Sequence, residues 1–151
     1  MNLRQISRWR AIQANEVRYK DYFLEDAEFV VIGFGTAGRV ALSAVRAARQ
    51  QGIKVGLLRP ITVYPFPHQV IQQLAGRVSA FLVTEMNSGQ MLEDVRLAVQ
   101  GRAPIEFYGR MGGVVPLPDE ILSEIQRIAA GPLSVDTDPR DAWYERMAGV
   151  R

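Results

Sequence analysis

The stretch FVVIGFGTAGRVALSAVRAARQQG, residues 29–52, decides the fold because two different periodicities meet in it. Residues 29–32 form a short, fully apolar run rich in β-branched side chains, which predicts a strand buried on both faces. Apolar side chains then recur at intervals of three and four residues up to Ala48, which predicts a helix that packs one stripe on a sheet. Gln51-Gly52 ends this helix, since glycine is the usual residue just past a helix end.

The alternation of strand and helix continues along the chain. Three prolines between residues 60 and 67 interrupt regular structure, so we expect residues 61–66 to form an ordered loop. Strands alternating with helices predict an α/β fold with a mainly parallel sheet, covered on both faces and joined by right-handed crossovers. We expect further strands at 54–58, 78–84 and 105–108, and helices at 68–74, near 92–99 and, as the last helix, from Pro118 onwards.

The N-terminal segment, residues 1–23, is expected to be a docking helix or linker. Its apolar residues are spaced as on a short amphipathic helix that lies on another surface. The absence of an acid before Glu16 is also typical of a transit peptide, but Trp9 and a single serine favour a docking helix. Residues 22–24 then form an edge strand or a connector. The apolar stripe consists of Leu3, Ile6, Trp9 and Ile12.

The C-terminal segment, residues 131–151, is rich in proline, aspartate and arginine, and we expect a loosely attached extension there. Trp143 and Tyr144 indicate a docking contact within it. The predicted organisation is therefore a docking segment at 1–23, a single α/β domain at 24–130 and the extension at 131–151.

Composition excludes several kinds of site. The chain has no cysteine and one histidine, His68, so its own residues cannot supply a cysteine-held iron–sulfur cluster, a thiolate zinc site or a multi-histidine metal site. Nucleic-acid binding is not expected, because the arginines are scattered apart from Arg4, Arg8 and Arg10. No apolar run reaches the roughly 20 residues that span a bilayer. The absence of cysteine is compatible with a cytoplasmic protein.

The motif Gly33-x-Gly35-x-x-Gly38 matches the dinucleotide-binding fingerprint and lies between a strand and a helix, where a helix N-terminus attracts phosphate. The fingerprint also needs an acid about 20 residues further on, and Arg59-Pro60 stands there instead. An arginine suits a 2′-phosphate, so NADP binding is one interpretation. The favoured interpretation is that the glycines allow a tight turn and close packing of helix on sheet.

A second polar cluster, residues 85–90 with the sequence EMNSGQ, follows a predicted strand at its carboxyl end, where α/β proteins bind ligands. Glu85 could act there as an acid or a base. The alternative is that Asn87 or Ser88 caps the next helix while Glu85 and Gln90 bond to loops or to a partner. For an isolated domain this alternative is favoured. His68 is interpreted as a surface or interface residue.

An ordered set of motifs resembles one family. The segments are VVIGFGTAGR (30–39), GIKVGLLRPIT (52–62), PFP (65–67), EMNSGQMLEDV (85–95), YGR (108–110) and GG (112–113). In this order they resemble the C-terminal domain of α subunits of 2-oxoacid:ferredoxin oxidoreductases, over about residues 24–127. The resemblance implies a fold similar to the transketolase C-terminal domain: a three-layer α/β/α sandwich with about five strands, one of them antiparallel.

The resemblance also implies the reaction, cofactors and partner subunits of the enzyme to which such a domain belongs. Such enzymes convert a 2-oxoacid and coenzyme A to acyl-CoA and CO2 and pass electrons to ferredoxin, using thiamine diphosphate and iron–sulfur clusters held in other parts of the complex. This domain is then a structural, subunit-interaction part that binds no cofactor alone. Its partners would be the thiamine-binding domains, the β subunit and, through the complex, ferredoxin; a homo-oligomer is also possible. The chain would be a truncated piece or a separately encoded subunit, and its 2-oxoacid is not identified.

We therefore assign no catalytic residue, and two alternatives stay open: a free-standing NADP-binding module using residues 33–38, and a regulatory or assembly protein derived from the enzyme. Expected contact points are Trp9, the 65–67 loop and Trp143, since aromatic anchors dominate interfaces. If the domain touches a ligand, the loops after the strands are the place. The candidate ligand-facing residues are Gly35, Thr36, Arg59, Thr62, Glu85, Asn87 and Gln90.

Overall fold

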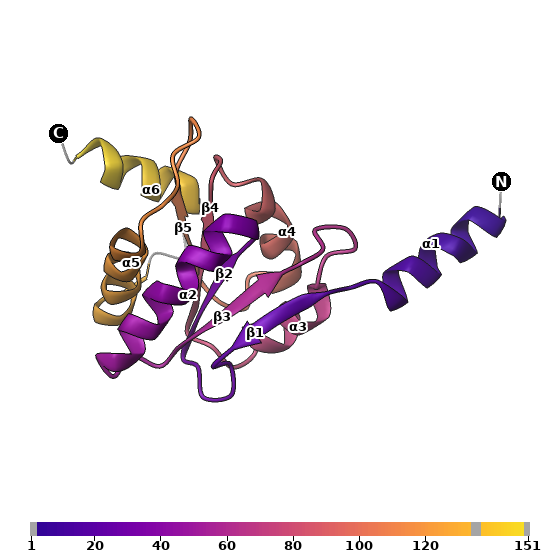
Figure 1. Ribbon diagram of the computed structural model, residues 1–151, viewed down its shortest axis with the longest axis horizontal. Coiled ribbons are helices and arrows are strands. Elements are labelled where there is room, and N and C mark those ends of the chain that lie inside the picture. Colours follow the sequence, from indigo (N-terminus) through magenta and orange to yellow (C-terminus); the bar gives the residue numbers. More distant parts are fainter. Residues whose placement is uncertain (1–2, 134–136, 150–151) are drawn as a thin grey trace.

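A five-stranded sheet forms the centre of the computed structural model, which describes residues 3–133 and 137–149 (Figure 1). Its strand order is β1-β3-β2-β4-β5. Only β1 runs antiparallel, pairing Tyr19 with Pro60 of β3, and the other pairs are parallel. The strands are β1 (Tyr19–Tyr22), β2 (Phe29–Gly33), β3 (Val55–Pro60), β4 (Ala80–Glu85) and β5 (Ile105–Gly109).

Helices cover both faces of this sheet and give the predicted three-layer α/β/α sandwich (Figure 1). Helices α2 (Gly35–Gln50) and α5 (Pro118–Ala130) pack together on one face, and α3 (His68–Ala75) and α4 (Gln90–Val99) pack together on the other. The central strands consist mainly of apolar residues because both of their faces are buried, and all six residues of β4 are buried.

Helix α1 (Leu3–Asn15) is present where the sequence predicts an N-terminal helix, but it projects away from the body of the domain (Figure 1). None of its residues is buried. The edge strand that follows it, β1, lies at residues 19–22 instead of 22–24. β3 extends two residues beyond its predicted end, because Arg59 and Pro60 pair with β1.

Helix α6 (Pro139–Ala148) corrects the prediction that the helix from Pro118 is the last. It packs on β5, where the Trp143 ring lies edge-on to Phe107 with centroids 5.5 Å apart. Arg146 donates to the Phe107 carbonyl at 3.2 Å. The described part of the tail is therefore a packed helix, anchored by a tryptophan that is only 8% exposed.

Replacing Trp143 by alanine is expected to lower the free energy of unfolding by about 3 kcal/mol, because a buried aromatic side chain leaves a cavity. The control is Tyr144→Ala on the same helix, whose side chain is largely exposed; its effect should stay within about 0.5 kcal/mol. Urea denaturation of the two variants measures both values. Equal stability of the two variants would contradict the packed position of α6.

Candidate functional site

The loops that follow the four parallel strands all meet at one edge of the sheet, which we call the carboxyl edge. An open hollow of about 630 Å³ lies there between the start of α2 and the end of β4. Five of the seven candidate residues line this hollow. They are Gly35, Thr36, Glu85, Asn87 and Gln90.

Two of these side chains accept hydrogen bonds from the backbone N–H groups at the start of α4. The Glu85 carboxylate accepts hydrogen bonds from the backbone N–H groups of Met91 and Leu92 at 3.0 and 2.9 Å. Asn87 Oδ1 accepts from the N–H groups of Gly89 and Gln90 at 2.8 and 2.9 Å. These are donors that a helix start leaves without intrahelical partners. The polar cluster thus stabilises α4, as the capping interpretation of Asn87 expects.

The glycine motif brings α2 into direct contact with β2. A Cβ on Gly38 would lie 2.2 Å from the Gly33 carbonyl oxygen, and a Cβ on Gly33 would lie 2.9 Å from the Gly38 Cα. Neither distance is tolerable, so both positions need glycine for packing alone. Gly35 differs, because it has φ of +58° and its missing Cβ faces open space. The close helix–sheet contact supports the packing interpretation of this motif.

Arg59 and Thr62 do not line the hollow. The Arg59 side chain lies along α2, with its Cγ 2.9 Å from the position that a Cβ on Gly38 would take. Thr62 Oγ1 accepts from the Arg18 N–H at 3.0 Å and donates to the Pro65 carbonyl at 3.0 Å, so it holds the loop against the linker before β1. The two halves of the dinucleotide fingerprint therefore do not share this hollow.

An ion pair organises the last loop of this edge, residues 110–117. Arg110 pairs with Glu120, which also accepts from the Leu117 N–H at 2.8 Å. Burial acts to raise the pKa of Glu120, but the hydrogen bonds from Arg110 and Leu117 outweigh it, so this pKa is lowered. Burial, reinforced by the Glu120 carboxylate, raises the pKa of Tyr108 to about 12. The loop is thus fixed by polar contacts at its base.

Glu85, the buried carboxylate beside the hollow, uses both oxygens to hold α4. Within residues 3–133 and 137–149, no three histidine, cysteine, aspartate or glutamate side chains cluster in a way that could hold a metal ion. No helix in the same ranges is long and apolar enough to cross a membrane.

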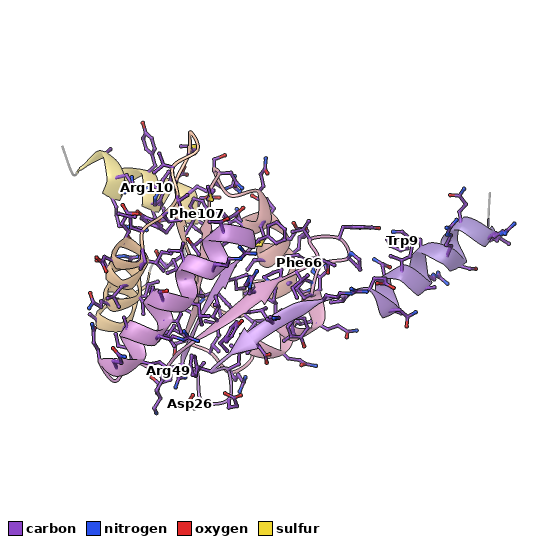
Figure 2. The ribbon with its side chains drawn as sticks, in the orientation of Figure 1. Trp9, Asp26, Arg49, Phe66, Phe107 and Arg110 are labelled. Carbon is purple, nitrogen blue, oxygen red and sulfur yellow. The ribbon has the colours of Figure 1, made fainter. Side chains whose placement is uncertain are left out.

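The expected contact points are corrected in part. Trp9 is exposed on α1 (Figure 2). Phe66 of the 65–67 loop and Trp143 are instead buried in the core, so neither is free to anchor a partner. What the sequence reasoning missed is a set of exposed apolar side chains on the loops of the carboxyl edge. They include Phe34, Val63, Tyr64, Met111, Val114 and Leu117.

Comparison with known proteins gives one family match, to pyruvate:ferredoxin oxidoreductase core domain II, over residues 27–121. Ketoisovalerate oxidoreductase subunit VorB of Methanothermobacter marburgensis is 48% identical over 122 residues. That alignment covers 81% of this chain and 34% of the relative. The chain therefore spans about a third of the relative's length.

Two solved structures share the fold. The 2-oxoglutarate:ferredoxin oxidoreductase of Magnetococcus marinus superposes with a TM-score of 0.69 at 19% identity, over 79% of this chain and 21% of that one. A split-gene transketolase, solved as an inactive β4 tetramer, gives 0.58 at 13% identity, over 72% of this chain and 41% of that one. These likenesses confirm the predicted transketolase C-terminal-like fold.

Glu85→Ala is expected to lower the free energy of unfolding by about 2 kcal/mol, because it leaves two buried N–H donors of α4 without a partner. Asn87→Ala should lower it by about 1 kcal/mol through loss of a cap. Gln90→Ala is the control, since its side chain is exposed at the same edge. Denaturant unfolding of all three variants gives the comparison. A neutral Glu85→Ala would show that the carboxylate is not structural.

Tyr108 also makes stability depend on pH. The folded-state pKa of Tyr108, about 12, lies above its ordinary value of 10.0. The protonated phenol therefore stabilises the folded state fully below pH 10, and this stabilisation is lost as the pH rises towards 12. Tyr108→Phe should therefore remove part of the decline in stability over this range. Thermal unfolding at pH 9 to 12 measures the difference. An unchanged decline in the variant would contradict the burial of this phenol.

Proposed function

Because this chain belongs to the pyruvate:ferredoxin oxidoreductase core domain II family, we propose that it is a structural, subunit-interaction domain of a 2-oxoacid:ferredoxin oxidoreductase. The complete enzyme would convert a 2-oxoacid and coenzyme A to acyl-CoA and CO2, with two electrons passed to two oxidised ferredoxins and one proton released. The domain would not catalyse this reaction by itself.

The observation that carries this proposal is that the Glu85 carboxylate has a structural role. It is the carboxylate that the sequence places at the ligand-binding edge of an α/β sheet, and both of its oxygens accept backbone hydrogen bonds from α4. A general acid or base needs a carboxyl group that can reach a substrate proton. Glu85 is 5% exposed and engaged, which suits a structural role.

The cofactors of the reaction belong to other parts of the enzyme. A cysteine-ligated cluster has no ligand in a chain without cysteine. For thiamine diphosphate, the resemblance to 2-oxoacid:ferredoxin oxidoreductases implies a site between other domains of the enzyme. We therefore place thiamine diphosphate and the clusters in the thiamine-binding domains, the β subunit and their neighbours, with ferredoxin meeting the complex in the cytoplasm.

A free-standing nucleotide-binding module is the second candidate, and one observation favours it. The first turn of α2 lines the hollow, and its N-cap residue Phe34 makes no side-chain capping bond, so the dipole end of this helix faces the hollow. Arg59, which would have to meet a 2′-phosphate, does not line the same hollow.

The deciding experiment is affinity purification of the tagged protein from its native host, followed by mass spectrometry. The proposal predicts stoichiometric recovery of large subunits whose sequences carry thiamine-binding and cluster-binding motifs. Calorimetry with NADP serves as the second arm and should show no saturable binding. Recovery of the chain alone, together with NADP binding that Gly35→Val abolishes without unfolding the domain, would favour the nucleotide module instead.

A further inference from the structure

We propose that the carboxyl edge of the sheet, continued by helix α1, is the surface that docks on the thiamine-binding part of the enzyme. This inference rests on the function proposed above. It assigns a face of the domain and the chemistry of its occupant. The surface consists of Phe34 and the loops 61–67, 86–89 and 110–117, with the apolar stripe of α1 beside them.

The first observation is a difference in charge between the two edges of one sheet. The four loops of the carboxyl edge hold twenty residues and one charged side chain, Arg110, which is paired with Glu120. The four loops of the opposite edge, at 23–28, 51–54, 76–79 and 100–104, hold nineteen residues and six charged side chains. They are Glu25, Asp26, Glu28, Lys54, Arg77 and Arg102.

This difference indicates that only one edge is solvated in the working protein. Charged residues make up 23% of the chain, which would place between four and five of them among twenty loop residues. The centre of a protein interface is depleted in charge because desolvating an unpaired charge is unfavourable. Glu16 and Arg18, in the linker at the carboxyl edge, pair with each other at 2.9 Å and leave no free charge there.

The second observation is where the exposed apolar side chains gather. Eight of the fifteen large apolar side chains exposed in the described residues lie in the carboxyl-edge loops. One, Phe23, lies in the opposite loops, and the Arg49 guanidinium covers its ring at 5.0 Å. Exposed apolar side chains that gather on one side of a domain indicate an interaction site. The eight are Phe34, Ile61, Val63, Tyr64, Met111, Val114, Val115 and Leu117.

Helix α1 continues this surface. The Trp9 indole donates a hydrogen bond to the Tyr64 hydroxyl, which ties the helix to the 61–67 loop. No residue of α1 is buried, and Trp9 and Ile12 in its apolar stripe are 45% and 39% exposed. A helix of 13 residues is only marginally stable alone in water, so α1 needs a partner for its apolar face.

The charges of α1 define the chemistry of that partner. The helix carries Arg4, Arg8 and Arg10 and no acid, so the surface that receives it should combine an apolar groove with acidic side chains. A second copy of this chain fits poorly, because the four loops of the carboxyl edge contain no acidic residue to meet these arginines. The fitting occupant is the remainder of the enzyme, since the chain matches only 34% of the length of its VorB relative.

Charge insertion on the docking surface tests the assignment. Met111→Glu and Val114→Glu, made separately in the tagged protein, place a carboxylate in the 110–117 loop of this edge, and Leu97→Glu is the matched control. Leu97 is equally large and 68% exposed, but it lies on α4 outside the edge loops. Circular dichroism and thermal unfolding should give the same stability for all variants, because each replaced side chain is exposed.

The expected result is that subunits with thiamine-binding motifs co-purify with the wild type and Leu97→Glu, and fall by about tenfold or more with the two edge variants. Undiminished recovery with both edge variants would overturn the docking surface and leave the proposed function standing. No recovery with the wild type would overturn both. A concentration-dependent dimer in sedimentation that Val114→Glu dissociates would assign the edge to a second copy and refute the proposal.

Discussion

The parallel pairing of β2 with both β3 and β4 is the constraint on which the rest of the structure depends. Parallel neighbours cannot be joined by tight turns, so each connection must cross the sheet as a helix. This requirement creates the helical layers and sends every strand–helix loop to the same edge. The close approach of Gly38 to Gly33 allows α2 to seat directly on β2. The glycine motif therefore serves the fold first.

Much of this fold is predictable because the central strands are buried on both faces. β2, β3, β4 and β5 lie within two residues of their expected bounds. The edge strand β1 is harder to place, since its sequence YKDY is mostly exposed and has no buried run. Helix α6 was missed because Trp143 is its buried residue and most of its neighbours are charged. Its sequence therefore resembles that of a polar tail.

The candidate site shows a different limit of sequence reasoning. The sequence locates seven candidate residues at the carboxyl edge, and five of them line one hollow. The sequence suggests that Asn87 caps α4, but it does not reveal that both oxygens of Glu85 accept backbone hydrogen bonds from the same helix. The apolar surface is invisible for another reason. Each loop contributes only a few apolar residues, and the topology alone brings Phe34, Val63 and Val114 to one edge.

A domain in which Glu85 and Asn87 hold α4 and the carboxyl-edge loops carry a single, paired charge is suited to assembly. Hydrogen–deuterium exchange of the chain, alone and in the complex isolated from its host, tests this claim most directly. The account predicts new protection in α1 and in residues 61–64, 86–89 and 110–117, with little change at 23–28, 51–54 and 100–104. Protection confined to the charged loops of the opposite edge would contradict it.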